Sequence, residues 1–189
     1  LKTPLAFAEL DPPEDPTIIF YREPAAPDME IETTPQLLDA VDTARILWIP
    51  ASRLAFDRSR TTVTELLQRR NRKHHTVLDL DWRPMFWDSE EQAHAAISPM
   101  LDHVTIAIGN RKECEVAVGT DDPDEAADRM LDRGLDAAIV KLGGDGVMVA
   151  TPQLRERLSP YPVEVVCGLG SGDAFGGALG ISFPTGQRW

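Results

Sequence analysis

Short apolar runs recur along the chain, and most are followed by a stretch with the periodicity of a helix. The runs that predict single strands cover residues 17–21, 45–50, 75–84, 103–110 and 162–167, and residues 136–150 predict a strand, a glycine turn and a second strand. The stretches that predict helices cover residues 34–44, 61–70, 89–101, 110–119 and 124–132. The inner runs are apolar without alternation, which is typical of a parallel sheet covered on both faces. The pattern therefore predicts an α/β fold with a doubly wound, mostly parallel sheet.

Polar and charged side chains follow the predicted strands at their carboxyl ends. Asp79, Asp81 and Arg83 lie toward the carboxyl end of the strand predicted over 75–84. Asn110 and Lys141 lie at the ends of the next two predicted strands along the chain. Because ligands of open α/β sheets bind beyond the carboxyl ends of the strands, we expect a functional site at this edge.

A glycine-rich turn, GLGSGDAFGG at residues 168–177, opens a further helix. It fits neither G-x-G-x-x-G nor the P-loop G-x-x-x-x-G-K-[ST], because Asp173 replaces the last glycine of the first motif and Ala178 replaces the lysine of the second. The N–H groups of a helix start bind anions, and glycine at 170 and 172 would let a phosphate approach without a Cβ clash. Asp173 then has two readings, a helix N-cap or a general base in phosphoryl transfer.

Composition and charge narrow the classes of protein and partner. The 189 residues suffice for one sizeable core, and the net charge of -12 argues against a general nucleic-acid binder. The basic stretch 69–75, RRNRKHH, is read either as a solvated helix end and loop or as a nucleic-acid contact.

No apolar run approaches the ~20 residues of a membrane helix, and the first residues do not have the pattern of a secretory signal. Two cysteines, Cys114 and Cys167, and four histidines without ligand spacing predict neither a disulfide framework nor a zinc-type metal site, and favour a reducing cytoplasm.

The glycine turn with the cysteine before it, CGLGSGDAFGG, resembles the C-terminal signature of the PfkB (ribokinase-like) carbohydrate kinases, D-[TS]-x-G-A-G-D. The match covers Gly170, Gly172 and Asp173, with Ser171 in place of alanine, while the first two positions of the signature differ. The resemblance implies a ribokinase-like, three-layer αβα fold. It also implies that Asp173 is the catalytic base and that the N–H groups of Gly170, Ser171 and Gly172 form an anion hole.

Three further stretches resemble motifs of the same family. GNRKE is similar to the N-x-x-E motif, which implies that Asn110 and Glu113 lie near Mg²⁺ and the phosphates. VKLGGDGV resembles the strand and turn that line the nucleotide. LDLDWRP resembles a D-x-N-x-R segment, with Asp81 where asparagine is common. The resemblance therefore implies ATP and Mg²⁺, and the residues that it places nearest to the nucleotide are Lys141, Gly143, Gly144, Gly146 and Asn110.

Longer stretches between about residues 5 and 180 resemble one branch of the family, the 5-dehydro-2-deoxygluconokinases of myo-inositol breakdown. This resemblance implies transfer of the ATP γ-phosphate to the 6-hydroxyl of 5-dehydro-2-deoxy-D-gluconate. A sugar carboxylate favours guanidinium partners. Tyr21 and Arg22 resemble a pair that related kinases set against their substrates, and Arg83 is a second candidate. Each arginine has the alternative of pairing with a neighbour, Arg22 with the Glu23 side of the loop and Arg83 with Asp79 or Asp81.

Other functions stay open beside this one. A kinase of 2-keto-3-deoxygluconate or of another sugar is one alternative, and a truncated remnant without catalysis is another. The expected partners are a small sugar acid and ATP, with neither nucleic acid nor membrane, and a homo-oligomer is considered beside a monomer.

The resemblance predicts one partial kinase domain over residues 1–189. Residues 1–33 are expected to form a substrate or lid-side segment, residues 34–180 the α/β core, and residues 181–189, ISFPTGQRW, an atypical tail. The opening strands and the Gly-Gly-Asn sugar signature of the family have no counterpart here. We therefore expect a fold that is truncated at both ends.

Overall fold

The computed structural model describes residues 1–11 and 17–182. The chain divides into two compact units, residues 31–160 and residues 1–30 with 161–189. Within the described residues, no helix has the length and apolar character needed to cross a membrane. Of the predicted tail 181–189, residues 183–189 lie outside the described residues, and the first two residues belong to the last helix.

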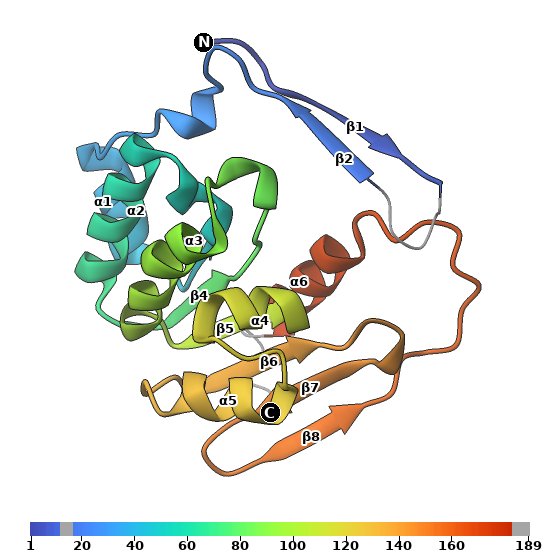
Figure 1. The fold of residues 1–189 in the computed structure, drawn as a ribbon. Helices are drawn as coiled ribbons and strands as arrows, with labels where there is room; N and C mark the ends of the chain where they lie inside the picture. The colour runs from blue at the N-terminus through green and yellow to red at the C-terminus, as the bar shows by residue number, and fades with distance from the viewer. Residues whose placement is uncertain (12–16, 183–189) are drawn as a thin grey trace. The chain divides into compact units, whose positions relative to one another are not determined.

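The larger unit, residues 31–160, is built on a six-stranded sheet (Figure 1). Its strands, in order across the sheet, are β3 (Ile46–Pro50), β4 (His75–Asp79), β5 (Ile106–Asn110), β6 (Ala137–Lys141), β7 (Val147–Ala150) and β8 (Arg155–Leu158). Neighbouring strands are parallel from β3 to β6 and antiparallel from β6 to β8. The predicted α/β fold with a mostly parallel sheet is confirmed.

Five α-helices accompany this sheet in residues 31–160. They are α1 (Pro35–Thr43), α2 (Asp57–Arg70), α3 (Glu90–Ile97), α4 (Arg111–Val118) and α5 (Pro123–Leu131). Shorter 3₁₀ segments are η2 (Ala51–Ala55), η3 (Pro84–Phe86), η4 (Ser98–His103) and η5 (Gly143–Asp145).

Local chemistry explains where these helices begin and end. The side chain of Thr34 accepts the N–H of Leu37 at the start of α1, and that of Ser89 accepts the N–H of Gln92 at the start of α3. The helix predicted over 89–101 changes to the 3₁₀ segment η4 after Ile97. Proline at position 99 lacks an N–H and its ring disfavours the preceding α-helical turn, so the α-helix does not continue.

One apolar core holds the larger unit together. Alternate residues of the central strands, such as Leu78 and Leu80 or Ala138 and Val140, point into it because side chains two apart share one face of a strand. Helices α2 to α5 contribute the residues that pack against this face: Val63, Leu67, Ala93, Ile97, Cys114, Val116, Ala117, Val118, Ala126, Ala127 and Met130. The three-layer arrangement implied by the family stays a prediction.

The basic stretch 69–75 forms the turn between α2 and β4. Arg69 is ion-paired with Asp42, and Arg70 is 1% exposed. The guanidinium of Arg72 donates to the backbone carbonyls of Asp102 (2.8 Å), Arg133 (2.5 Å) and Gly134. These arginines therefore tie turns together, and the reading of a wholly solvated helix end is wrong for Arg70.

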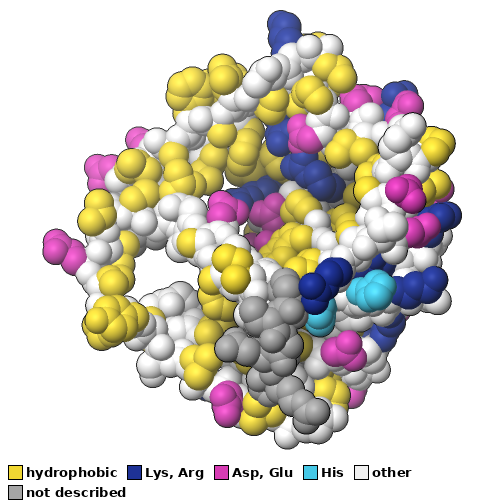
Figure 2. Space-filling model, turned by 180° about the vertical axis from the view of Figure 1, so that it is seen from behind, with side chains coloured by type: hydrophobic (Ala, Val, Ile, Leu, Met, Phe, Trp, Pro, Cys, Tyr) yellow, Lys and Arg dark blue, Asp and Glu magenta, His cyan; other side chains and the backbone are white. Residues whose placement is uncertain are grey.

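The smaller unit contains a β-hairpin, β1 (Leu5–Glu9) and β2 (Thr17–Tyr21), followed by the 3₁₀ segment η1 (Pro27–Met29). The two strands are antiparallel, with Leu5 opposite Tyr21. The ring of Phe7 meets that of Tyr21 edge-on, at 5.5 Å between centroids. Figure 2 shows hydrophobic side chains open at the surface along this hairpin, where Leu5, Phe7 and Ile19 are exposed. We predicted β2 from its sequence and did not predict β1.

The smaller unit also contains α6 (Ser171–Ser182), which confirms the helix expected after the glycine turn. The strand predicted over 162–167 is wrong, because the structure assigns no strand there. Val163, Val165 and Val166 are exposed. β-branched residues favour a strand, but a strand also needs a hydrogen-bonded neighbour, and none pairs with this segment among the described residues.

Candidate functional site

The carboxyl ends of β4, β5 and β6 bring together residues that lie far apart in the sequence. Asn110 is opposite Lys141 in the register of β5 and β6, and Asp79 at the end of β4 is opposite Ile108. Glu113, one turn into α4, also reaches this edge, since its carboxylate lies 3.5 Å from the Nζ atom of Lys141. The predicted gathering of polar strand-end residues is present for these positions.

Asn110 and Glu113 form a reciprocal cap at the start of α4. The Asn110 side chain accepts the N–H of Glu113 at 2.9 Å, and Oε2 of Glu113 accepts the N–H of Asn110 at 2.6 Å. Gly109 lies beside them, and a Cβ there would be 2.7 Å from Cδ1 and 3.0 Å from Cβ of Leu80, so a larger residue would force the Leu80 side chain to shift. The cap fixes the direction of the Glu113 carboxylate, which is buried.

Asp79 lies in a partly buried group of charges at the same edge. Burial raises the pKa of its carboxyl group above the usual 3.8, Lys141 opposes this shift, and the nearby carboxylates Asp81 and Glu113 add to it. The ammonium group of Lys141 thus offsets the negative charge of Asp79 and of Glu113 at the strand ends.

We predict that Asp79→Asn makes the free energy of unfolding less dependent on pH. The folded chain binds the Asp79 proton more tightly than the unfolded chain, so wild-type stability falls as the pH rises from about 3.8 through the folded pKa. The asparagine variant does not have this loss, so wild type should lose stability relative to it as the pH rises above about 4. Urea unfolding at three pH values measures the difference, with Asp57→Asn at an exposed carboxylate as the control. If the difference in the free energy of unfolding between wild type and Asp79→Asn were the same at all three pH values, the prediction would be contradicted.

The two cysteines differ strongly in their surroundings. Cys114 of α4 is 0% exposed and burial raises the pKa of its thiol to about 12, whereas Cys167 is partly exposed. Both are free. Because the thiolate is the reactive form, a disulfide reagent at pH 8 should modify one cysteine rapidly in the folded chain and two in urea. Cys167→Ser should remove the fast reaction, and two cysteines reacting at equal rates would overturn the assignment.

The glycine turn between β6 and β7 combines two kinds of glycine. Gly146 is required by the fold, because its φ is +94° and a Cβ there would lie 2.0 Å from the carbonyl oxygen of Leu158. Gly143 has a φ of +61°. Gly144 has neither a positive φ nor any atom within 4 Å of a built Cβ. The fold alone does not require glycine at 144, so its bare backbone is open to a ligand.

Arg83 and Asp81 are directly paired beyond the end of β4. Nε of Arg83 donates to Oδ1 of Asp81 at 2.8 Å, and the hydroxyl of Ser52 donates to Oδ2 at 2.5 Å. The alternative pairing considered for Arg83 is therefore present, through one of its three nitrogens. Sequence reasoning did not identify Ser52, which precedes Asp81 by 29 residues and belongs to no motif.

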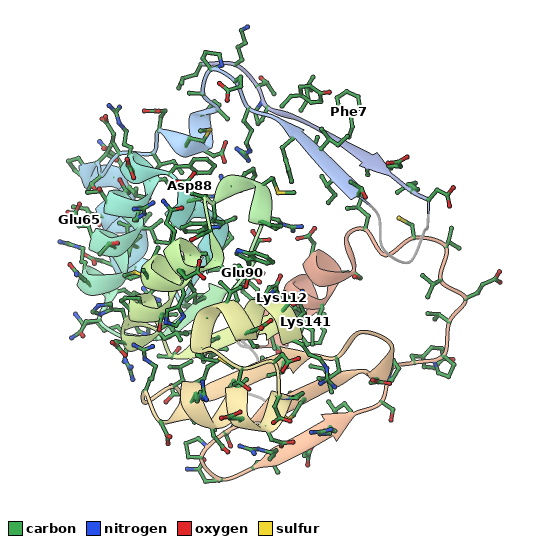
Figure 3. The ribbon with its side chains drawn as sticks, viewed as in Figure 1. Phe7, Glu65, Asp88, Glu90, Lys112 and Lys141 are labelled. Carbon is green, nitrogen blue, oxygen red and sulfur yellow. The ribbon has the colours of Figure 1, made fainter. Side chains whose placement is uncertain are left out.

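The aromatic residues of the same segment are mainly structural. Trp87 is 8% exposed and belongs to the core, while Trp82 and Phe86 pack against it. The ammonium group of Lys112 lies 5.5 Å from the centre of the Trp82 ring. It is also ion-paired with Glu90 of α3 at 2.9 Å, and both side chains are labelled in Figure 3. Lys112 is a charged residue of this edge that sequence reasoning did not select.

Tyr21 and Arg22 lie in the smaller unit and differ in accessibility. Tyr21 is 59% exposed. The Arg22 side chain is 16% exposed, and its Nη1 atom donates to both carboxylate oxygens of Asp28 at 2.7 and 2.8 Å. The neighbour that pairs with Arg22 is therefore Asp28, on the segment after β2, rather than the Glu23 side of the loop.

The predicted phosphate cradle opens α6. Gly170 has a φ of +83° and no atom within 4 Å of a built Cβ, and its carbonyl accepts the N–H of Ala174 at 2.9 Å. The helix begins at Ser171, whose N–H donates to the carbonyl of Gly168 at 3.3 Å. Asp173 is the third residue of the helix and is exposed, so the N-cap reading is wrong for it. A carboxylate in the first turn still interacts favourably with the helix dipole.

Asn110 and Glu113 are compatible with a magnesium–phosphate complex. Oε2 of Glu113 is engaged in the cap and faces Lys141, while Oε1 has no hydrogen-bond partner among the described residues. Mg²⁺ commonly takes one or two protein carboxylates and completes its shell with phosphates and water. Within the part of the chain that the structure describes, no cluster of three or more His, Cys, Asp or Glu could hold a metal. The residues therefore fit a metal that arrives with a nucleotide, rather than a protein-only metal cage.

Comparison with known proteins decides the family. The model of the pfkB family carbohydrate kinases matches residues 1–189. The chain belongs to the PfkB family. Among curated relatives of this PfkB chain, 5-dehydro-2-deoxygluconokinase of Geobacillus thermodenitrificans is 29% identical over 99% of the chain and 56% of the relative. The enzyme of the same name from Bacillus subtilis is 27% identical over 98% of the chain and 58% of the relative.

Solved structures share the fold of this PfkB chain. A fructokinase from Xylella fastidiosa with bound ATP has a TM-score of 0.80 at 20% identity, over 99% of the chain and 58% of that structure. A putative ribokinase II from E. coli in complex with ATP and Mg²⁺ has a TM-score of 0.80 at 22% identity, over 97% and 58%. The PfkB chain thus spans somewhat more than half the length of the proteins it matches.

Proposed function

We propose that this chain is part of a kinase that uses ATP and Mg²⁺ to phosphorylate 5-dehydro-2-deoxy-D-gluconate on its 6-hydroxyl in the breakdown of myo-inositol, in the cytoplasm. The observation that carries the proposal is the start of α6. There, an exposed Asp173 stands three residues after Gly170, a glycine with φ +83° and open space around it. Membership of the PfkB family and the names of the curated relatives support the same chemistry.

In this proposal, the start of α6 performs the proton transfer and holds the anion. The 6-hydroxyl oxygen of the sugar acid bonds to the γ-phosphorus of ATP while the carboxylate of Asp173 accepts the hydroxyl proton. At the same time, the bond from that phosphorus to the bridging oxygen breaks and ADP leaves. The first N–H groups of a helix lack intrahelical partners, so that of Gly172 is suited to hold a phosphoryl oxygen. The N–H of Ser171 would join it by exchanging its 3.3 Å bond to the carbonyl of Gly168 for the anion.

The strand ends of the larger unit take the nucleotide in this proposal. Gly143, Gly144 and Gly146 offer a backbone turn, and Lys141 adds a positive charge at the same edge. Asn110 and Glu113 hold the metal and phosphates, and Mg²⁺, when bound, offsets the charge of the phosphate groups.

For the sugar acid, Arg83 is better suited than Arg22 as a carboxylate partner. The Arg83 side chain is 41% exposed and uses one nitrogen in its pair with Asp81, whereas the Arg22 side chain is 16% exposed and donates to both carboxylate oxygens of Asp28. Tyr21 and Arg22 are kept as substrate-binding candidates of the smaller unit.

A panel of sugars with ATP and Mg²⁺ tests the proposal. Release of ADP should be faster with 5-dehydro-2-deoxy-D-gluconate than with 2-keto-3-deoxy-D-gluconate or D-fructose. A preference for D-fructose would reject the sugar-acid substrate and favour another sugar kinase of the family. Calorimetry with ATP tests the remaining alternative, since a remnant without catalysis or nucleotide binding would release no heat.

A further inference from the structure

Ser52, Asp81 and Arg83 form a chain of contacts at the carboxyl edge of the larger unit. Ser52 lies in η2, directly after β3, and Asp81 follows β4 by two residues. These two strands are parallel neighbours, with Pro50 opposite Asp79, so both segments leave the sheet at one edge (Figure 1). The Ser52 side chain has little freedom to move, because Ser52 is 2% exposed.

The Asp81 carboxylate is bound on both oxygens by different donors. Ser52 donates to Oδ2 at 2.5 Å, and Nε of Arg83 donates to Oδ1 at 2.8 Å. The hydroxyl of a buried serine therefore sets the orientation of the carboxylate, and the carboxylate in turn sets that of the guanidinium. A charge-assisted bond of this kind is about twice as strong as a neutral one.

The pairing leaves the outer edge of Arg83 available. Its two terminal nitrogens have no hydrogen-bond or ion-pair partner among the described residues, and its side chain is 41% exposed. Two parallel N–H donors are the group that binds a planar carboxylate at two points.

The acidic surroundings make this orientation important. Asp81 and Glu113 both lie close enough to Asp79 to contribute to the raised pKa of its carboxyl group, and the three acids would repel an incoming carboxylate. A guanidinium held in front of Asp81 offers such a ligand a favourable charge and screens it from that acid.

We propose that Asp81, fixed by Ser52, is a positioning residue that aims Arg83 at the carboxylate of the sugar acid. The proposal rests on the proposed function and names the residues that would make it selective for an acid over a neutral sugar. The affinity for the acid then depends on Asp81 although Asp81 does not touch the ligand.

The test compares variants by their KM and kcat for 5-dehydro-2-deoxy-D-gluconate, for D-fructose and for ATP, with calorimetric Kd values for the same ligands. Asp81→Ala should raise the KM or Kd of the acid about tenfold, the scale of one misaligned charged hydrogen bond. It should leave the KM of ATP and the affinity for D-fructose within about twofold. Asp81→Asn keeps an acceptor for Nε of Arg83 and should lie between wild type and Asp81→Ala. Ser52→Ala should act in the same direction as Asp81→Ala.

Two further variants keep the test decisive. Arg83→Gln alters an exposed side-chain end and should match the acid-specific loss even if Asp81→Ala does not fold. Asp42→Asn, which breaks the surface pair with Arg69, is the control and should change none of the constants. Equal losses for acid and neutral sugar, or no loss in Asp81→Ala and Arg83→Gln, would overturn the proposal. A wild-type chain that binds neither sugar acid nor ATP would instead overturn the proposed function, and this inference with it.

Discussion

Asp173→Asn is expected to lower kcat for the sugar acid by at least ~10²-fold, the usual effect of removing a positioned general base. The asparagine has nearly the same size but does not accept the proton of the attacking hydroxyl. Because Asp173 is exposed and is the third residue of α6, the substitution should leave the helix and the affinity for ATP nearly unchanged. Initial rates and calorimetry measure the two quantities separately.

Glu164→Gln is the matched control for this change. Glu164 is an exposed acid of the same segment that lies before the glycine turn, so its loss should leave kcat within about twofold. If Asp173→Asn turned over at the wild-type rate, Asp173 would have no role beyond its favourable position near the helix dipole.

Gly146→Ala is expected to destabilise the larger unit by about 3 kcal/mol or more. The backbone there has φ +94° and ψ -133°, a conformation nearly restricted to glycine, and the new Cβ would lie 2.0 Å from the carbonyl oxygen of Leu158. That oxygen belongs to the last residue of β8, so relief of the clash would distort the pairing of β7 with β8. Urea unfolding followed by tryptophan fluorescence measures the loss.

Gly144→Ala, two residues earlier in the same turn, is the control. It meets no atom within 4 Å and has no positive φ, so stability should change by less than about 1 kcal/mol. Under the proposed function it should nonetheless weaken ATP binding, because a methyl group there would obstruct a phosphate that approaches the backbone. Equal destabilisation by the two variants would show that the turn does not have the geometry described.

The parts of the fold that were predictable are those set by local pattern. Apolar runs placed the strands that carry Asp79, Asn110 and Lys141 close to their observed positions, although the strand predicted over 75–84 ends at Asp79 in the structure. Parallel pairing then requires these three residues to share one edge. The reciprocal cap of Asn110 and Glu113 is likewise a contact over three residues. Such signals are contained in short stretches of sequence.

The parts that were not predictable depend on partners distant in sequence. Nothing near Asp81 indicates that Ser52 would bind it, and nothing near Arg72 indicates that it would bind carbonyls 30 and 62 residues away. The segment 162–167 shows the converse, since its valines have strand propensity but no strand pairs with them in the described residues. Propensity is local, whereas pairing is a property of the folded chain.

The contacts of Arg72 have a mechanical consequence for the larger unit. The guanidinium of Arg72 binds four backbone carbonyls of the turns that precede β5 and β6, at the rim opposite the strand ends that carry Asn110 and Lys141. That rim is crosslinked between turns that lie far apart in the sequence, whereas the turn after β6 is held by local bonds, in which the N–H of Gly146 donates to the carbonyl of Gly143. We therefore expect the rim that Arg72 crosslinks to resist distortion of the sheet.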